Sequence, residues 1–156
     1  NKGWTIAKAL LSFERIFLGS PKQSQYALQR LTSIAAERGL FTDPAFTERY
    51  TRLRLDVLDL EALYGRFAAI VKAGGTLGPD VSLLKIWATE TYARLTELML
   101  EAAGPDGATL GKIGSSEAGV DVVAAFYNAR PATIYGGANE IQRNIVAKGV
   151  LELPDD

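Results

Sequence analysis

Residues 43–75, with the sequence DPAFTERYTRLRLDVLDLEALYGRFAAIVKAGG, carry the strongest structural pattern in the chain. Their apolar residues are spaced alternately by four and by three positions: Phe46, Tyr50, Leu53, Val57, Leu60, Tyr64, Phe67 and Val71. On an α-helix this spacing forms one continuous apolar stripe. Asp43 and Pro44 are typical of a helix start, and Gly74 and Gly75 of a helix end. We therefore predict a long amphipathic helix between these signals.

The same spacing recurs in the segment that begins near Pro79 and ends before Gly104. Its apolar positions are Val81, Leu84, Ala88, Tyr92, Leu95, Met99 and Ala102. Upstream of residue 43, Ser20 with Pro21 and Gln23 predicts a capping box that opens a helix.

That upstream helix is expected to reach about Arg38 and to stop at Gly39. Shorter helices are expected over residues 4–18, 116–127 and 139–149. Long helices joined by short loops predict an all-α fold, an up-and-down four-helix bundle with additional short C-terminal helices, as one domain over residues 1–156.

Composition excludes several classes of site. The 156 residues carry a net charge of −1, which gives no electrostatic reason to expect nucleic acid or an anionic membrane as a partner. No apolar stretch approaches the roughly 20 residues that a membrane-spanning helix needs. Without cysteine there is no disulfide or zinc–thiolate site, and without histidine there is no Ser-His-Asp triad. Any acid–base chemistry must use Asp, Glu, Lys or Tyr, and no metal site is expected.

Glu14 is the first candidate for such chemistry. On a helix, its neighbours three and four positions away are apolar: Leu10, Leu11, Phe17 and Leu18. A desolvated carboxylate has a raised pKa, which suits a general base. The alternative is that Glu14 lies at the edge of the stripe, where it reaches water or pairs with Arg15.

The second candidate is the segment that contains Tyr135, Gly136 and Gly137, just before a predicted helix at Asn139. Two glycines allow a close approach to the backbone, and a helix N-terminus presents free N–H groups. Such a place suits a phosphate, a flavin edge or an acyl oxygen. The alternative is a plain glycine turn capped by the Asn139 side chain.

Two stretches resemble the carboxy-terminal domain of the acyl-CoA dehydrogenase family. IYGGANEIQRNIVAKGVLELP, residues 134–154, resembles the family signature Tyr-Glu/Gly-Gly-Thr-x-Glu/Gln-Ile-Gln-Arg-Asn. GWTIAKALLSFER, residues 3–15, resembles the beginning of the same domain. The resemblance implies that the chain is a fragment of a longer polypeptide, with helical and β domains upstream, and that the isolated fragment is inactive.

The resemblance also implies a catalytic base. Family members carry it either directly after the tyrosine of the final motif or on the first helix of the domain, before an arginine. The first position is Gly136 here, which cannot act as a base. The second is Glu14, followed by Arg15, so the family pattern assigns Glu14 as the base. Ser12, Arg15 and Gly137 match positions at which members of the family contact the substrate.

Further positions match the family's cofactor contacts. Ala138, Asn139 and Glu140 match the stretch that contacts FAD, although Ala138 replaces the usual threonine. Glu101 and Gly104 match a motif that reaches the flavin of the neighbouring subunit, with an acid in place of an amide. Arg38 and Phe41 match the motif that holds the FAD pyrophosphate across the dimer. These departures indicate a divergent subfamily or one subunit of a hetero-oligomer.

The implied function is the α,β-dehydrogenation of an acyl-CoA thioester in lipid catabolism, in which Glu14 takes the α-proton and N5 of FAD takes the β-hydride. The implied partners are acyl-CoA, an electron-transfer flavoprotein or similar acceptor, and further subunits in a homo- or hetero-oligomeric dimer of dimers. The implied location is a bacterial cytoplasm or a mitochondrial matrix. Two alternatives stay open: a non-catalytic partner subunit, and a relative that oxidises a different substrate or uses oxygen as the acceptor.

Overall fold

The computed structural model describes residue 3, residues 16–114 and residues 119–154. Its α-helices are α2 (Lys22–Glu37), α3 (Pro44–Lys72), α4 (Ser82–Ala102), α5 (Val122–Ala129) and α6 (Asn139–Gly149). Short 3-10 helices join them: η1 (Leu40–Thr42), η2 (Pro79–Val81), η3 (Gly104–Ala108) and η4 (Pro131–Thr133). In the described residues, β pairing is limited to one antiparallel bridge between Ile113 and Val120.

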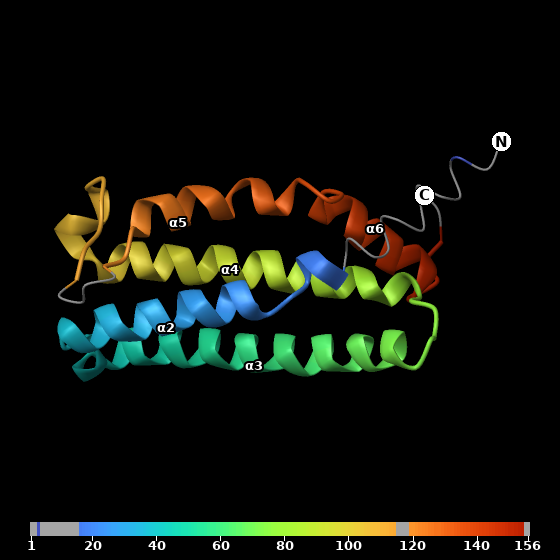
Figure 1. The fold of residues 1–156 in the computed structure, drawn as a ribbon, viewed down its shortest axis with the longest axis horizontal. Helices are drawn as coiled ribbons and strands as arrows, with labels where there is room; N and C mark the ends of the chain where they lie inside the picture. The colour runs from blue at the N-terminus through green and yellow to red at the C-terminus, as the bar shows by residue number, and fades with distance from the viewer. Residues whose placement is uncertain (1–2, 4–15, 115–118, 155–156) are drawn as a thin grey trace.

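Helix α4 lies at the centre of the bundle. It packs against α2 and α3 on one side, and α5 and α6 follow one another along its remaining face (Figure 1). Successive long helices run in opposite directions and are joined at alternate ends of the molecule (Figure 1). The predicted all-α bundle with additional short C-terminal helices is therefore confirmed. Among the described residues, no helix is both long and apolar enough to cross a membrane.

The two heptad stripes form the core as predicted. All seven positions of the second stripe are buried, from Val81 at the end of η2 to Ala102 at the end of α4. On α3, the buried stripe residues are Phe46, Leu53, Val57, Leu60 and Phe67, and the remaining three are half-buried. Asp43 caps α3, since its carboxylate accepts from the Ala45 N–H at 2.9 Å.

The predicted capping box at Ser20 is wrong. Pro21 itself occupies the cap position of α2, with a helical φ of −72°, and no side chain bonds to the cap amides. The Ser20 N–H instead donates to the Phe17 carbonyl at 3.2 Å, which closes a turn. Ser20 thus lies one residue too early to reach the amide that a capping box requires.

The predicted helix over residues 116–127 begins too early. Gly119 has a φ of 45° and Val120 pairs with Ile113, so the backbone is not helical there. Asp121 provides the true cap, because its carboxylate accepts from the Ala124 N–H at 2.8 Å. Residues 115–118 lie outside the described part of the chain.

Candidate functional site

The turn that precedes α6 contains both glycines of the second sequence candidate. Gly136 and Gly137 have φ values of 65° and 91°, a left-handed conformation that costs a side-chain-bearing residue free energy. The buried Gln142 amide lies beneath the turn and donates to the Gly136 and Gly137 carbonyls at 3.4 and 3.3 Å. The backbone is therefore held in an orientation that other residues do not readily adopt.

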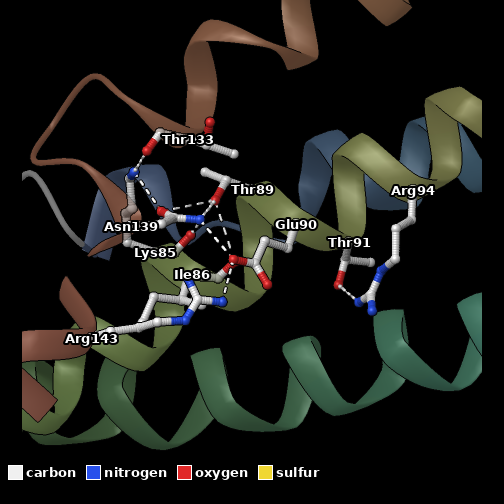
Figure 2. Close-up of polar contacts among 9 residues, drawn as sticks. All are labelled: Lys85, Ile86, Thr89, Glu90, Thr91, Arg94, Thr133, Asn139 and Arg143. Atoms are coloured by element: carbon white, nitrogen blue, oxygen red, sulfur yellow. Dashed lines mark hydrogen bonds and ion pairs between the residues drawn. The ribbon is translucent and has the colours of Figure 1, made fainter. Parts of the chain in front are cut away.

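Asn139 does not cap α6, so the cap expected in the glycine-turn alternative is wrong. Ala138 lies at the cap position and no side chain bonds to the cap amides. The Asn139 side chain is 3% exposed and points toward α4 (Figure 2). Its Nδ2 donates to Thr89 Oγ1 at 3.1 Å and to Glu90 Oε1 at 3.0 Å. The predicted FAD contact of Asn139 is not tested, but its amide group is already bonded inside the protein.

Lys85 is a site residue that the sequence analysis missed. Its side chain is fully buried on α4, where Nζ donates to Asn139 Oδ1 at 2.7 Å and to the Thr133 carbonyl at 3.0 Å. Burial lowers the pKa of the Lys85 ammonium, and the charges of Glu140 and Glu90 partly oppose this shift. Its position carried a signal, since Lys85 follows Val81 by four residues and precedes Ala88 by three on the buried stripe.

A cavity of about 340 Å³ lies between the start of α2, the middle of α4 and the turn before α6. Its lining includes Phe17 and Leu18 from the end of the opening segment, Tyr92 from α4, and Tyr135 from the turn. Burial raises the pKa of the Tyr92 hydroxyl. The cavity therefore joins two segments that sequence analysis singled out separately.

The predicted base and two of the predicted substrate contacts lie outside the described residues. Glu14 precedes Phe17 and Leu18 by three and four positions in the sequence. Ser12 and Arg15 belong to the same undescribed range. Their roles stay predictions.

The four predicted cofactor contacts outside the glycine turn lie at the ends of two helices: Arg38 and Phe41 follow α2, and Glu101 and Gly104 lie at or just after the C-terminal end of α4. Arg38 forms an ion pair with Asp106, and a Cβ on Gly104 would lie 3.2 Å from Arg38 Nη1. The Phe41 ring meets the edges of Phe46 and Tyr50, with centroids 5.8 and 5.0 Å apart. The structure thus places Arg38 next to Gly104, and the cofactor roles of Arg38, Phe41 and Gly104 stay predictions.

Glu101 lies at this same end and forms a two-point ion pair with Arg49. The distances are 2.7 Å to Nη1 and 2.9 Å to Nη2. The hydrogen bond from Arg49 lowers the pKa of the Glu101 carboxyl. Both side chains are more than half exposed, so the pair contributes only about 0–1 kcal/mol to stability.

Replacing Gly137 with alanine should destabilise the protein by about 1–3 kcal/mol, because of backbone strain at a positive φ. An added Cβ would also lie 2.5 Å from Gln142 Nε2, so that amide would have to move. The matched control is Gly65→Ala, inside α3, where a Cβ meets nothing within 4 Å. That change should stabilise the helix by about 0.5–1 kcal/mol. Urea denaturation of both variants measures the free energy of unfolding. If Gly137→Ala were as stable as Gly65→Ala or more stable, the strain assigned to the turn would be contradicted.

Comparison with known proteins identifies the family. The family model "Acyl-CoA dehydrogenase, C-terminal domain" matches residues 1–151. The chain is 35% identical, over 158 residues, to acyl-CoA dehydrogenase IpdE1 of Mycobacterium tuberculosis, covering 97% of this chain and 38% of that protein.

Two solved structures share the fold. The ChsE4-ChsE5 complex of Mycobacterium tuberculosis matches with 24% identity and a TM-score of 0.80, covering 99% of this chain and 42% of that one. Butyryl-CoA dehydrogenase of Megasphaera elsdenii matches with 20% identity and a TM-score of 0.82, covering 96% and 39%. The chain thus spans about two fifths of the length of these proteins. Since the family model spans nearly all of its residues, this chain belongs to the acyl-CoA dehydrogenase family and corresponds to that family's C-terminal domain.

Proposed function

We propose that this chain forms one wall of the acyl-CoA site in an FAD-dependent acyl-CoA dehydrogenase and supplies its base, Glu14. The supporting observation is the cavity that joins Phe17 and Leu18, which closely follow Glu14, to Tyr135 of the glycine turn. The reaction requires the base and the turn to lie close together, because the base takes the α-proton and the turn faces the adjacent thioester group. A cavity that both segments line is what this proposal requires.

The chemistry explains why such an arrangement is needed. The α-proton of a thioester is only weakly acidic, so the base needs a raised pKa in a site that excludes water. Glu14 has apolar neighbours at helical spacing, which favour such a shift. Negative charge develops on the thioester oxygen as the proton leaves, and backbone N–H groups near Gly137 are suited to stabilise it. FAD, when bound, supplies the hydride acceptor.

The first turn of α6 is compatible with FAD binding. Its N–H groups have no acceptor within the helix, and Glu140 is exposed there. The negative charge of Glu140 disfavours a pyrophosphate at this helix end, so an uncharged ring edge is the better match. A cavity of about 340 Å³ is at the small end of ligand sites. We therefore propose that upstream domains of a longer polypeptide complete the site.

Anaerobic addition of an acyl-CoA to the complete polypeptide tests this function. We expect the visible absorption of bound FAD to bleach, because a dehydrogenated thioester leaves two electrons on the flavin. The control is the corresponding S-alkyl-CoA thioether, which lacks the carbonyl that acidifies the α-proton and should leave the spectrum unreduced. Bound flavin that no acyl-CoA bleaches would contradict the proposal and favour a relative with another substrate.

A non-catalytic partner subunit is the second candidate, and one observation favours it. Arg38 and Glu101, which match cross-subunit flavin contacts, are both engaged in ion pairs within this chain. A fold relative, ChsE4-ChsE5, is a complex of two named proteins. Purifying the complete polypeptide alone and measuring FAD per chain separates the candidates. A colourless but cooperatively folded protein would favour the partner subunit.

A further inference from the structure

A single buried ammonium group bonds to both sides of the glycine turn. Lys85 Nζ donates to the carbonyl of Thr133, two residues before Tyr135, and to Oδ1 of Asn139, two residues after Gly137 (Figure 2). Within the turn, Gln142 donates to the carbonyls of Gly136 and Gly137 at 3.4 and 3.3 Å. Lys85 therefore connects α4 to both ends of the segment that carries the two glycines.

Asn139 extends this link into a chain of polar contacts that ends at the surface. Its Nδ2 donates to Glu90 Oε1 at 3.0 Å, and Arg143 Nη2 donates to the same oxygen at 2.6 Å. The side-chain amide of Asn139 therefore bridges the positive Lys85 and the negative Glu90: it accepts from the ammonium and donates to the carboxylate. This arrangement reduces the cost of burying the ammonium, which an unpaired charge could not avoid.

The polar chain also touches the cavity. Thr89 accepts from Asn139 Nδ2 at 3.1 Å and donates to the Lys85 carbonyl at 2.9 Å, and it lines the cavity together with Tyr135. Thr89 thus links the Asn139 side chain to the wall of the cavity. The contacts of one lysine are coupled to the shape of the proposed acyl site.

We propose that Lys85 is a positioning residue, which holds the turn from Tyr135 to Asn139 in the orientation that the acyl-CoA reaction uses. It acts through the Thr133 carbonyl and the Asn139 amide and does not touch the substrate. The proposal rests on the proposed function for its effect on the reaction. Its effect on the turn itself can be measured independently.

The test compares Lys85→Met with Lys72→Met in the complete polypeptide. Methionine keeps much of the apolar volume but leaves both acceptors without their donor. Lys72 is an exposed lysine at the end of α3 and serves as the matched control. Hydrogen exchange is followed at two bonded amides that bracket the turn: Tyr135, which donates to Pro131, and Gln142, which donates to Ala138. The buried Leu95 of α4 reports unfolding of the whole bundle.

In Lys85→Met we expect exchange at Tyr135 and Gln142 to accelerate about tenfold more than at Leu95, because opening becomes local. In Lys72→Met, the exchange rates at Tyr135 and Gln142 relative to the rate at Leu95 should not change. In the FAD-loaded protein, the rate constant for flavin reduction by acyl-CoA should fall at least about tenfold, while the dissociation constant changes less than about threefold. Such a split indicates loss of orientation and not loss of binding.

Equal acceleration at all three amides in Lys85→Met would overturn the proposal, since the lysine would then only stabilise the bundle. Selective acceleration with an unchanged reduction rate would also overturn it. If Lys85→Met does not fold, Asn139→Ala decides by the same two measurements, because it removes the side-chain acceptor of Lys85. If wild-type flavin is not reduced by any acyl-CoA, the proposed function fails, and the exchange ratios still decide the role of Lys85 in the turn.

Discussion

Replacing Glu14 with glutamine is expected to lower the rate of FAD reduction by acyl-CoA about 10²- to 10⁴-fold, the contribution typical of a positioned general base. Glutamine has nearly the same shape as glutamate, so binding contacts at this position are retained. Its amide cannot accept the α-proton, and Gly136 offers no carboxylate at the alternative family position. Turnover with an artificial electron acceptor, together with anaerobic flavin bleaching, measures the effect in the complete polypeptide.

The control for this experiment is Glu48→Gln. Glu48 is exposed on α3 and pairs with Arg52 one turn away, so its loss should leave turnover within about twofold of the wild-type value, as a surface pair contributes little. The FAD content and the unfolding temperature of both variants should match those of the wild type. Wild-type turnover in Glu14→Gln would rule out Glu14 as the base.

Replacing Phe67 with alanine is expected to reduce the free energy of unfolding by about 3–5 kcal/mol, through lost burial and a residual cavity. Phe67 is 1% exposed and belongs to a small buried cluster on α3, η2 and α4. The other buried members are Leu60, Val81, Leu84 and Ala88. Because Ile16 also packs against this cluster, the change should further loosen the segment that leads to the cavity. Urea denaturation followed by circular dichroism measures the stability.

The control is Leu58→Ala on the same helix. Leu58 is 49% exposed, so its truncation removes little buried surface and should cost less than about 1 kcal/mol. Both variants replace a large apolar side chain on α3 with alanine, so the helix propensity of the new residue is the same in the two. A similar loss of stability in the two variants would contradict the assignment of Phe67 to the core.

The long helices could be predicted from the sequence because their information is local and repeated. The apolar spacing repeats over several turns in both α3 and α4, and the helices pack along the stripes that this spacing defines. Helix starts were harder. Asp43 was recognised correctly, whereas Ser20 was not, because Pro21 took the cap position itself. A serine before a proline fits either arrangement, and only the direction of the incoming chain decides between them.

The candidate site was predictable only where its residues are close in sequence. The glycines at 136 and 137 announce a turn, and the family signature surrounds them. The pairing of Lys85 with Asn139 joins positions 54 residues apart, and no periodicity links them. Lys85 alone could have been noticed as a charge on an apolar stripe. Its partner could not, since an asparagine after two glycines more commonly caps a helix than enters a core.

The central position of α4 determines how the molecule can come apart. Every other α-helix in the described part of the chain packs against it, so most residues of α4 are buried or half-buried and only a narrow strip of the helix faces solvent. The buried part of α4 becomes accessible to solvent when a neighbouring helix detaches. Local loss of structure should therefore begin in the outer helices and reach α4 last. Lys85 and the cavity residues Thr89 and Tyr92 thus lie on the helix that is expected to lose its structure last.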